Sequence, residues 1–274
     1  MSSILNKVAA IGAERDRELL KEAATYIYSE RSEGDLHLHV FRPPNGNAPP
    51  NPLVVFFHGG LWDVSAPAQF VPHGLHFANR GAVAVVAETR VSSRHATGAP
   101  EAADDACEVI EWMTDHADTF DIDPARIAVG GAGGGAFLAL HTVMSEPGTT
   151  PSPRAVVLFS AIVDTGTNRE LHRHFPDART AKRMSPMKRV RRKLPPMILF
   201  HGTHDRIAPY SAVERFVRKL RFRGNRIELA DFEKEDHAFF NFNMSHRNFE
   251  LTIAAADRFL VSHGVLTPEP RGSA

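Results

Sequence analysis

Short apolar segments alternate with amphipathic segments along most of this chain. Apolar residues follow one another without interruption in Leu53–Phe57, Ala82–Ala87, Ile127–Val129, Ala155–Phe159 and Met197–Phe200. Such runs are typical of strands buried on both faces of a parallel sheet. Segments with helical spacing lie between and after these runs, at Gln69–Asn79, Glu101–Ala117, Ala136–Ser145 and Ser211–Arg221. A further strand is expected at Ile227–Phe232, followed by a last helix at Arg247–His263. The alternation predicts an α/β fold with a mostly parallel central sheet and helices on both faces.

The segments outside this alternation predict a few further features. Ile4–Ala24 has the spacing of an amphipathic helix on the outside of the fold. Leu36–Phe41 alternates apolar residues with histidines, which favours an antiparallel edge strand. Residues 164–196 are predicted to form a small cap over the carboxyl edge of the sheet, where ligands bind in such folds. Residues 1–266 are thus expected to be one domain, followed by a disordered Pro- and Gly-containing tail at 267–274.

Composition narrows the functional classes. The 274 residues carry 32 Lys and Arg against 32 Asp and Glu. A formal net charge of zero gives no global field that would attract nucleic acid or an anionic membrane, so we expect neither as a partner. The single cysteine, Cys107, excludes an internal disulfide and a CxxC metal site and is interpreted as a small core residue. No apolar stretch reaches the length of a signal peptide or a membrane span, so a cytoplasmic protein is expected, unless an upstream signal has been removed.

Two segments after predicted strands carry groups suited to acyl chemistry. His58-Gly59-Gly60-Leu61-Trp62 contains a glycine pair that lets the backbone turn sharply and present N–H groups to a developing oxyanion, although a plain turn is the alternative. Asp205 and His237 each follow a late strand. Either could be an ordinary turn residue, but their order along the chain fits the acid and base of a nucleophile–acid–base relay.

A third segment lies between the strand at Ile127–Val129 and the next helix. Gly131-Ala132-Gly133-Gly134-Gly135 falls where a G-x-S-x-G nucleophile elbow belongs, with Gly133 at its centre. With Ala136 the segment also satisfies the G-x-G-x-x-A dinucleotide fingerprint. The loop about 20 residues further on, Glu146-Pro147-Gly148, lacks the strand-end acid that should bind ribose, which argues against a nucleotide cofactor.

In combination these segments resemble the α/β-hydrolase carboxylesterases of the acetyl-esterase and hormone-sensitive-lipase type, including bacterial relatives named feruloyl or xylan esterases. The resemblance extends from about Leu36 to Leu266 and rests on HGGxW at His58–Trp62, on Glu88-Thr89-Arg90-Val91, on Asp121–Ile127, on His201–Asp205 and on His237–Asn241. It implies an α/β-hydrolase fold that acts on small esters or carboxylic acids, without a metal or another cofactor.

The resemblance also implies roles for particular residues. Asp205 would be the acid that orients His237, and His237 the general base. The oxyanion donors would be the amides of Gly60, Leu61 and Gly134. The residues expected to support these motifs are His58, Gly59, Trp62, Gly131 and Gly135.

The nucleophile's position falls on Gly133, which has no side chain and cannot form an acyl-enzyme. Loss of the nucleophile costs a serine hydrolase about a millionfold in turnover. None of the nearby serines, Ser92, Ser93 and Ser160, is expected on an elbow. Glycine also relieves the backbone strain of an elbow, which costs other residues about 1–3 kcal/mol.

Three functional hypotheses follow. The first is a carboxylic-ester hydrolase with very weak or absent turnover. The second is a non-catalytic pseudoenzyme that binds a small ester or acid. The third is chemistry in which His237, with Asp205, acts directly on a water molecule or a substrate proton.

Two further patterns bear on binding. His37 with His39, and His172 with His174, could begin a metal site, but no third ligand completes a recognisable spacing, so we interpret them as surface or edge histidines. The segment 179–193 has eight basic residues and no acid. It is interpreted as a solvated face of the cap or, alternatively, as a basic rim that favours an anionic substrate or partner.

Overall fold

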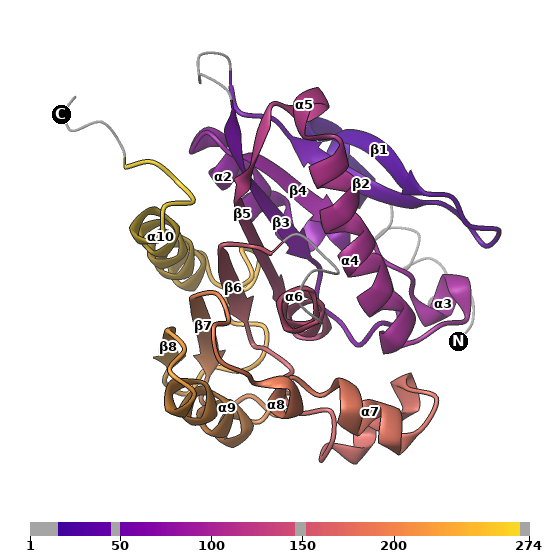
Figure 1. Ribbon diagram of the computed structural model, residues 1–274, viewed down its shortest axis with the longest axis vertical. Helices are drawn as coiled ribbons and strands as arrows, with labels where there is room; N and C mark the ends of the chain where they lie inside the picture. The colour runs from indigo at the N-terminus through magenta and orange to yellow at the C-terminus, as the bar shows by residue number, and fades with distance from the viewer. Residues whose placement is uncertain (1–15, 45–49, 146–151, 269–274) are drawn as a thin grey trace.

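An eight-stranded sheet organises the molecule, as the computed structural model of residues 16–44, 50–145 and 152–268 shows (Figure 1). The strands lie in the order β1-β2-β4-β3-β5-β6-β7-β8. Their bounds are β1 (Ala24–Ser29), β2 (Leu36–Phe41), β3 (Asn51–Phe57), β4 (Val83–Ala87), β5 (Ile122–Ala132), β6 (Ala155–Phe159), β7 (Met197–Gly202) and β8 (Ile227–Phe232). From β4 to β8 every neighbouring pair is parallel, which confirms the predicted architecture.

The amino-terminal strands differ from the prediction. β2 is antiparallel, as expected, but it lies between β1 and β4, so its predicted place at the sheet edge is wrong. The edge is β1, which begins at Ala24, the residue at which the predicted amphipathic helix was expected to end. Residues 16–22 are helical, whereas the earlier part of that predicted helix lies outside the described residues. Because β1 covers one side of β2, His39 becomes buried although the strand alternates.

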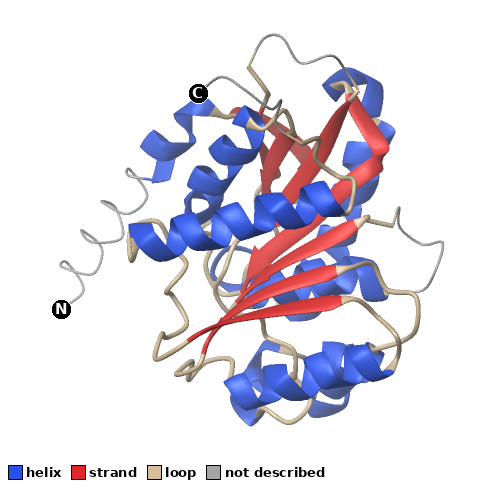
Figure 2. Ribbon diagram, turned by 90° about the vertical axis from the view of Figure 1, so that its left-hand side faces the viewer, coloured by secondary structure: helices blue, strands red, loops and turns tan. Residues whose placement is uncertain are grey.

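Helices cover both faces of the sheet (Figure 2). α2 (Val71–Asn79) and α10 (His246–Ser262) pack with the face that carries Phe56. α4 (Ala99–Asp115), α6 (Gly134–Met144) and α9 (Tyr210–Phe222) pack on the face that carries Phe57. The short elements are η1 (Leu20–Glu22), η2 (Pro67–Phe70), α3 (Ser92–His95) and α5 (Ala117–Phe120). None of the helices in the described ranges has both the length and the apolar character needed to cross a membrane.

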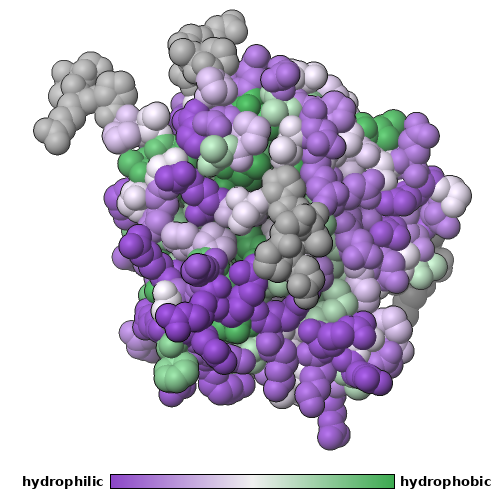
Figure 3. All heavy atoms as spheres, in the orientation of Figure 1, coloured by the Kyte–Doolittle hydropathy of each residue, from purple (hydrophilic) through white to green (hydrophobic). Residues whose placement is uncertain are grey.

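The segment predicted as a cap contains η3 (Arg169–His174), α7 (Ala178–Met184) and α8 (Pro186–Arg189). Two of its basic residues contact α6: Arg191 donates to the carbonyl oxygens of Val143 and Ser145, and Arg189 contacts His141 at 2.8 Å. The other basic side chains are exposed, namely Arg179, Lys182, Arg183, Lys188, Arg192 and Lys193. They lie on a part of the surface that is mostly hydrophilic in Figure 3.

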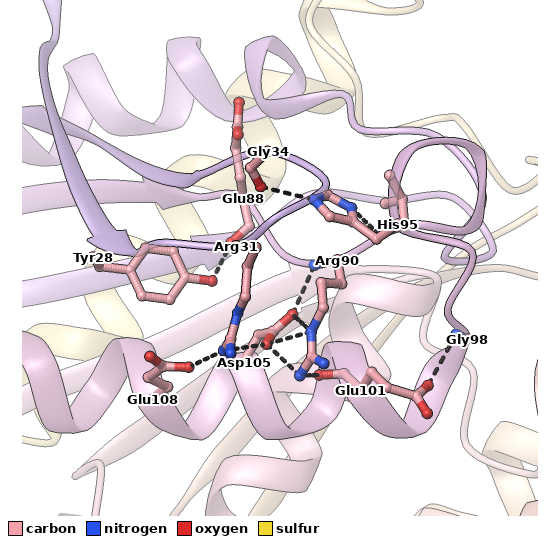
Figure 4. Close-up of polar contacts among 11 residues, drawn as sticks. Tyr28, Arg31, Gly34, Glu88, Arg90, His95, Gly98, Glu101, Asp105 and Glu108 are labelled. Carbon is pink, nitrogen blue, oxygen red and sulfur yellow. Dashed lines mark hydrogen bonds and ion pairs between the residues drawn. The ribbon is translucent and has the colours of Figure 1, made fainter.

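A buried ion-pair network ties the loop after β4 to α4 (Figure 4). The fully buried carboxylate of Asp105 accepts hydrogen bonds from the backbone N–H and the guanidinium of Arg90 and lies 3.6 Å from the guanidinium of Arg31. Further along this loop, Nε2 of His95 contacts the carbonyl oxygen of Gly34, and the N–H of Gly98 donates to Glu101. The network therefore fixes residues 90–98, which support the loop after β3.

Candidate active site

Gly133 occupies the sharp turn between β5 and α6. Its φ of +51° and ψ of −114° are a combination that L side chains rarely adopt. The turn is held by hydrogen bonds from the Gly133 N–H to the Phe159 carbonyl oxygen and from the Ile162 N–H to the Gly133 carbonyl oxygen. A Cβ atom built on Gly133 would lie 3.0 Å from Nε2 of His237. Position 133 thus has the strand-to-helix geometry that the sequence predicted for an elbow.

Asp205 and His237 meet beside this turn, from loops that follow β7 and β8. Nδ1 of His237 lies 2.7 Å from Oδ2 of Asp205. The other carboxylate oxygen of Asp205 accepts hydrogen bonds from the N–H groups of Ile207 and Ala208, and Nε2 of His201 lies 3.2 Å from Oδ2. The fold therefore brings together the acid and the base that the sequence placed 32 residues apart.

The environment of Asp205 keeps its carboxyl ionised. Burial by itself raises the pKa of this group, but the hydrogen bonds from His201 and His237, with that from the Ala208 amide, outweigh burial and hold the pKa well below its ordinary value. An ionised carboxylate only accepts hydrogen bonds, so Nδ1 of His237 carries the proton. Nε2, which faces Gly133, is then left as a proton acceptor.

The loop after β3 passes over the start of α6. The Gly134 N–H donates to the carbonyl oxygen of Gly60 at 3.0 Å, and the Leu61 N–H donates to Oδ1 of Asp63 at 3.3 Å. Gly60 has φ of +107°, which glycine adopts without strain. Two of the three amides expected as oxyanion donors are therefore engaged inside the protein in this conformation.

The residues predicted to support the motifs surround these groups closely. A Cβ atom on Gly135 would lie 2.1 Å from the Phe57 carbonyl oxygen, and one on Gly131 would lie 2.5 Å from the Gly135 backbone, so both positions need glycine for close packing. Trp62 is buried and packs edge-to-face on Phe137 at 5.1 Å. His58 is also buried, and burial lowers the pKa of its imidazole.

Sequence reasoning missed the residues that join the two loops. Gln69 accepts a hydrogen bond from the Gly59 N–H at 2.6 Å and donates to the side chain of Asn241 at 2.9 Å. Asn241 in turn donates to the Ala238 carbonyl oxygen, beside His237. Asn241 ends the His237–Asn241 stretch of the resemblance, which assigns it no role, and no sequence pattern singles out Gln69. Ser160 lies off the elbow, as expected, and its hydroxyl donates to the His237 carbonyl oxygen.

An apolar groove of about 870 Å³ starts at the loop after β3. Its lining includes the backbone of Gly59 and Gly60 and the polar side chains of Asp63, Gln69 and Asn241. We call it the α2 groove. Its apolar walls come from α2, the loop before α2, the amino-terminal helical turn, the segment before α10 and α10 itself; they consist of Leu19, Val64, Ala66, Ala68, Val71, Pro72, Leu75, Phe242 and Phe249. The groove therefore offers room for an aliphatic chain beside the Gly60 turn.

Two smaller cavities lie nearby. A cavity of about 570 Å³ is lined by polar groups that include Asp63, Thr97, Glu101 and Arg173. Another, of about 370 Å³, lies between residues 161–171 and residues 206–215. Segments of the predicted cap therefore border both cavities.

The alternative interpretations gain no support from the described residues. His37 and His39 both contact Glu88, at 3.2 and 3.3 Å, yet the described chain contains no group of three or more His, Cys, Asp or Glu side chains arranged to hold a metal. His172 and His174 contact Thr165 and Trp62 separately. At the start of α6, where a dinucleotide phosphate would bind, the Gly60 carbonyl oxygen already accepts from the Gly134 N–H.

Cys107 is half-buried, with its Sγ 3.9 Å from the Ser145 hydroxyl.

Comparisons with known proteins agree with this fold. Residues 54–241 match the family model described as alpha/beta hydrolase fold. An esterase from Thermogutta terrifontis, solved with butyrate bound, superimposes with a TM-score of 0.84 at 32% identity and covers 92% of this chain and 98% of its own. Isoprenylcysteine alpha-carbonyl methylesterase ICME of Arabidopsis thaliana is 24% identical over 77% of this chain and 55% of its own length.

Carboxylesterase NlhH of Mycobacterium tuberculosis is 29% identical over 52% of this chain and 49% of its own length. The chain thus spans about half the length of the curated relatives it matches.

Proposed function

Because this chain belongs to the family of α/β-hydrolase-fold proteins, we propose that it is a carboxylic-ester hydrolase whose turnover is very weak or absent, since Gly133 supplies no nucleophile. The observation that carries the proposal is the arrangement around position 133. A side chain there would meet Nε2 of His237, and His237 is in turn held by Asp205. This arrangement supports the nucleophile–base–acid geometry of acyl transfer, with Gly133 at the nucleophile's position.

The relatives support carboxylic esters as the ligand class. Their names include a methylesterase and a carboxylesterase, and the Thermogutta esterase was solved with butyrate and with propionate. We propose esters of aliphatic acids, with the acyl or alkyl chain in the α2 groove. Residues 164–196 would act as the cap, because they border two cavities beside the site.

Restoring the nucleophile tests the proposal. The Gly133→Ser variant should hydrolyse p-nitrophenyl acetate and p-nitrophenyl butyrate, whereas the unchanged chain should be lower in turnover by up to about a millionfold. Gly133→Ala is the matched control, because it adds the same Cβ without a hydroxyl and should remain inactive. Adding His237→Ala to Gly133→Ser should remove the restored activity. Silence of the serine variant on both esters would contradict the assigned site or the ligand class.

A second candidate function is binding without turnover. The α2 groove can hold an aliphatic chain, while the amides of Leu61 and Gly134 are engaged inside the protein and do not stabilise an oxyanion in this conformation. Calorimetric titration of the unchanged chain with butyrate would then show saturable binding with no product from the corresponding ester. Equal hydrolysis by the unchanged chain and by Gly133→Ser would instead favour direct action of His237 on water, and a His237→Ala variant of the unchanged chain would abolish that activity.

A further inference from the structure

The Gly60 carbonyl oxygen lies beside Gly134, whose amide would be an oxyanion donor in an α/β hydrolase. It accepts the Gly134 N–H at 3.0 Å and lies 3.6 Å from a Cβ atom built on Gly133. An oxyanion site requires N–H donors aimed at the developing negative charge. Here a carbonyl oxygen, which is itself partly negative, takes up the donor at the start of α6.

The orientation of one peptide group decides which atom points there. The Gly60 carbonyl and the Leu61 N–H belong to the same planar peptide and point in opposite directions. In the present orientation the Leu61 N–H donates to Oδ1 of Asp63 at 3.3 Å. If the peptide turned over, the Leu61 N–H would point toward position 133 and the Gly60 carbonyl oxygen toward Asp63. One rotation would thus remove a blocking acceptor and add a donor.

Asp63 favours the present orientation because a carboxylate only accepts hydrogen bonds. It can bind the Leu61 N–H, but it would repel a carbonyl oxygen brought to the same place. Asp63 is itself held firmly: its Oδ1 also accepts the Val64 N–H at 3.1 Å, and its carbonyl oxygen accepts the Ser93 N–H at 3.0 Å. Ser93 belongs to α3, at the end of the loop that the Arg90–Asp105 ion pair fixes (Figure 4).

The Gly60 Cα beside this fixed carboxylate is uncrowded. A Cβ atom on Gly60 would find only Oδ1 of Asp63 at 3.5 Å and the Val64 carbonyl oxygen at 3.9 Å, both at ordinary contact distance. The rotation changes ψ of Gly60 and φ of Leu61. Glycine tolerates either value of ψ, whereas Leu61 would move from negative to positive φ, a strain that also favours the present orientation.

We propose that Asp63 is a positioning residue that holds the Gly60–Leu61 peptide in the closed orientation, and that an ester or carboxylate ligand engages the Gly134 and Leu61 amides only after this peptide turns over. The proposal rests on the proposed function for the identity of the ligand. The hydrogen bond that it describes can be measured without any catalysis.

The first test measures that hydrogen bond directly. In the unchanged chain, nuclear magnetic resonance should detect a coupling across the hydrogen bond between the Gly134 nitrogen and the Gly60 carbonyl carbon. In Asp63→Asn, whose amide can donate to the Gly60 carbonyl oxygen, the coupling should weaken, and it should disappear when butyrate is saturating. An unchanged coupling in Asp63→Asn, with and without butyrate, would overturn the proposal even if no ester is hydrolysed.

The second test uses the Gly133→Ser background with p-nitrophenyl butyrate. Asp63→Asn should raise kcat by about tenfold and change KM by less than about twofold. A full oxyanion donor is worth about 10²–10³ in kcat, and the substitution only increases the fraction of molecules in which the Gly60–Leu61 peptide has turned over. Glu101→Gln is the charge control, because Glu101 lines the same polar cavity as Asp63 and glutamine can still accept the Gly98 N–H. Both are assayed in 0.5 M salt, which screens simple charge effects.

An equal rise in kcat for Glu101→Gln, or no rise for Asp63→Asn in an active Gly133→Ser enzyme, would overturn the role of Asp63. Inactivity of Gly133→Ser itself would count against the proposed function. The role of Asp63 would then be tested by the measurement of the Gly134–Gly60 coupling alone. If Asp63→Asn does not fold, Asp63→Ser provides the same comparison, since its hydroxyl can also donate to the Gly60 carbonyl oxygen.

Discussion

Gly133 and His237 face each other so closely that a Cβ atom on Gly133 would lie 3.0 Å from Nε2 of the imidazole, tighter than nine in ten real Cβ contacts. The ring cannot easily retreat, because Asp205 holds its opposite nitrogen at 2.7 Å. The backbone at position 133 also has a positive φ. Glycine therefore relieves two sources of strain at the point where a nucleophile would stand.

The Gly133→Ser variant should consequently gain hydrolysis while losing stability. The positive φ alone predicts a loss of about 1–3 kcal/mol in the free energy of unfolding. Urea denaturation monitored by tryptophan fluorescence measures it. Gly133→Ala should lose a similar amount because it has the same Cβ, and a serine variant as stable as the parent would show that the turn is not strained.

His73 should make stability depend on pH. It is fully buried on α2 among aromatic rings, neither ring nitrogen has a hydrogen-bond partner in the described ranges, and burial lowers the pKa of the imidazole to about 3. In the unfolded chain the pKa is about 6.5. Protonation of His73 thus favours unfolding. Its contribution to the free energy of unfolding is complete above pH about 6.5, and below that pH it falls by up to about 1.4 kcal/mol per pH unit.

A His73→Phe variant should remove this component. Its free energy of unfolding, measured by urea denaturation between pH 7 and pH 4.5, should decline less steeply than that of the parent. The remaining slope includes His141, whose pKa is also lowered, to about 4, by burial and by the neighbouring Arg189. Identical slopes for parent and variant would mean that His73 binds its proton inside the folded protein.

Asp105 should be important for stability. An Asp105→Ala change leaves the guanidinium of Arg90 without its buried partner. We expect the free energy of unfolding to fall by about 3 kcal/mol. This value is at the lower end of the range for a broken buried ion pair, because Arg90 is partly exposed. Thermal unfolding of Asp105→Ala and of the exposed neighbour Asp104→Ala gives the comparison. A loss for Asp105→Ala no larger than the roughly 0.5 kcal/mol typical of surface changes would rule out this role.

The α2 groove should select for chain length. In the Gly133→Ser background, Leu75→Asp places a charge on the groove wall and should raise KM for p-nitrophenyl octanoate by at least about tenfold, because each buried methylene is worth about 0.8 kcal/mol. KM for p-nitrophenyl acetate should change little. The control is Phe222→Asp, since Phe222 is 86% exposed at the end of α9 and does not line the groove. Equal effects of Leu75→Asp on both esters would refute a chain-binding role.

Local patterns in the sequence were enough to predict much of the fold. Uniform apolar runs located β3, β4, β6 and β7, because strands buried on both faces carry no polar positions. β1 was missed because it has neither an uninterrupted apolar run nor a burial pattern that alternates with polarity: the apolar Ile27 is exposed, whereas the polar Ser29 is buried. The place of β2 in the sheet depended on that missing neighbour, since an alternating strand looks the same at an edge and one position inside it.

The sequence by itself determined that position 133 lies on a strand-to-helix turn without a nucleophile, and that an acid and a histidine follow later strands in the order of a relay. These features depend on residue identity and on order along the chain. Only the tertiary structure decided that Gln69 meets Asn241 across 172 residues, and that the Gly60 carbonyl oxygen binds the Gly134 N–H. Such contacts depend on how separate loops are oriented in space, and a peptide group can point either way without any change in sequence.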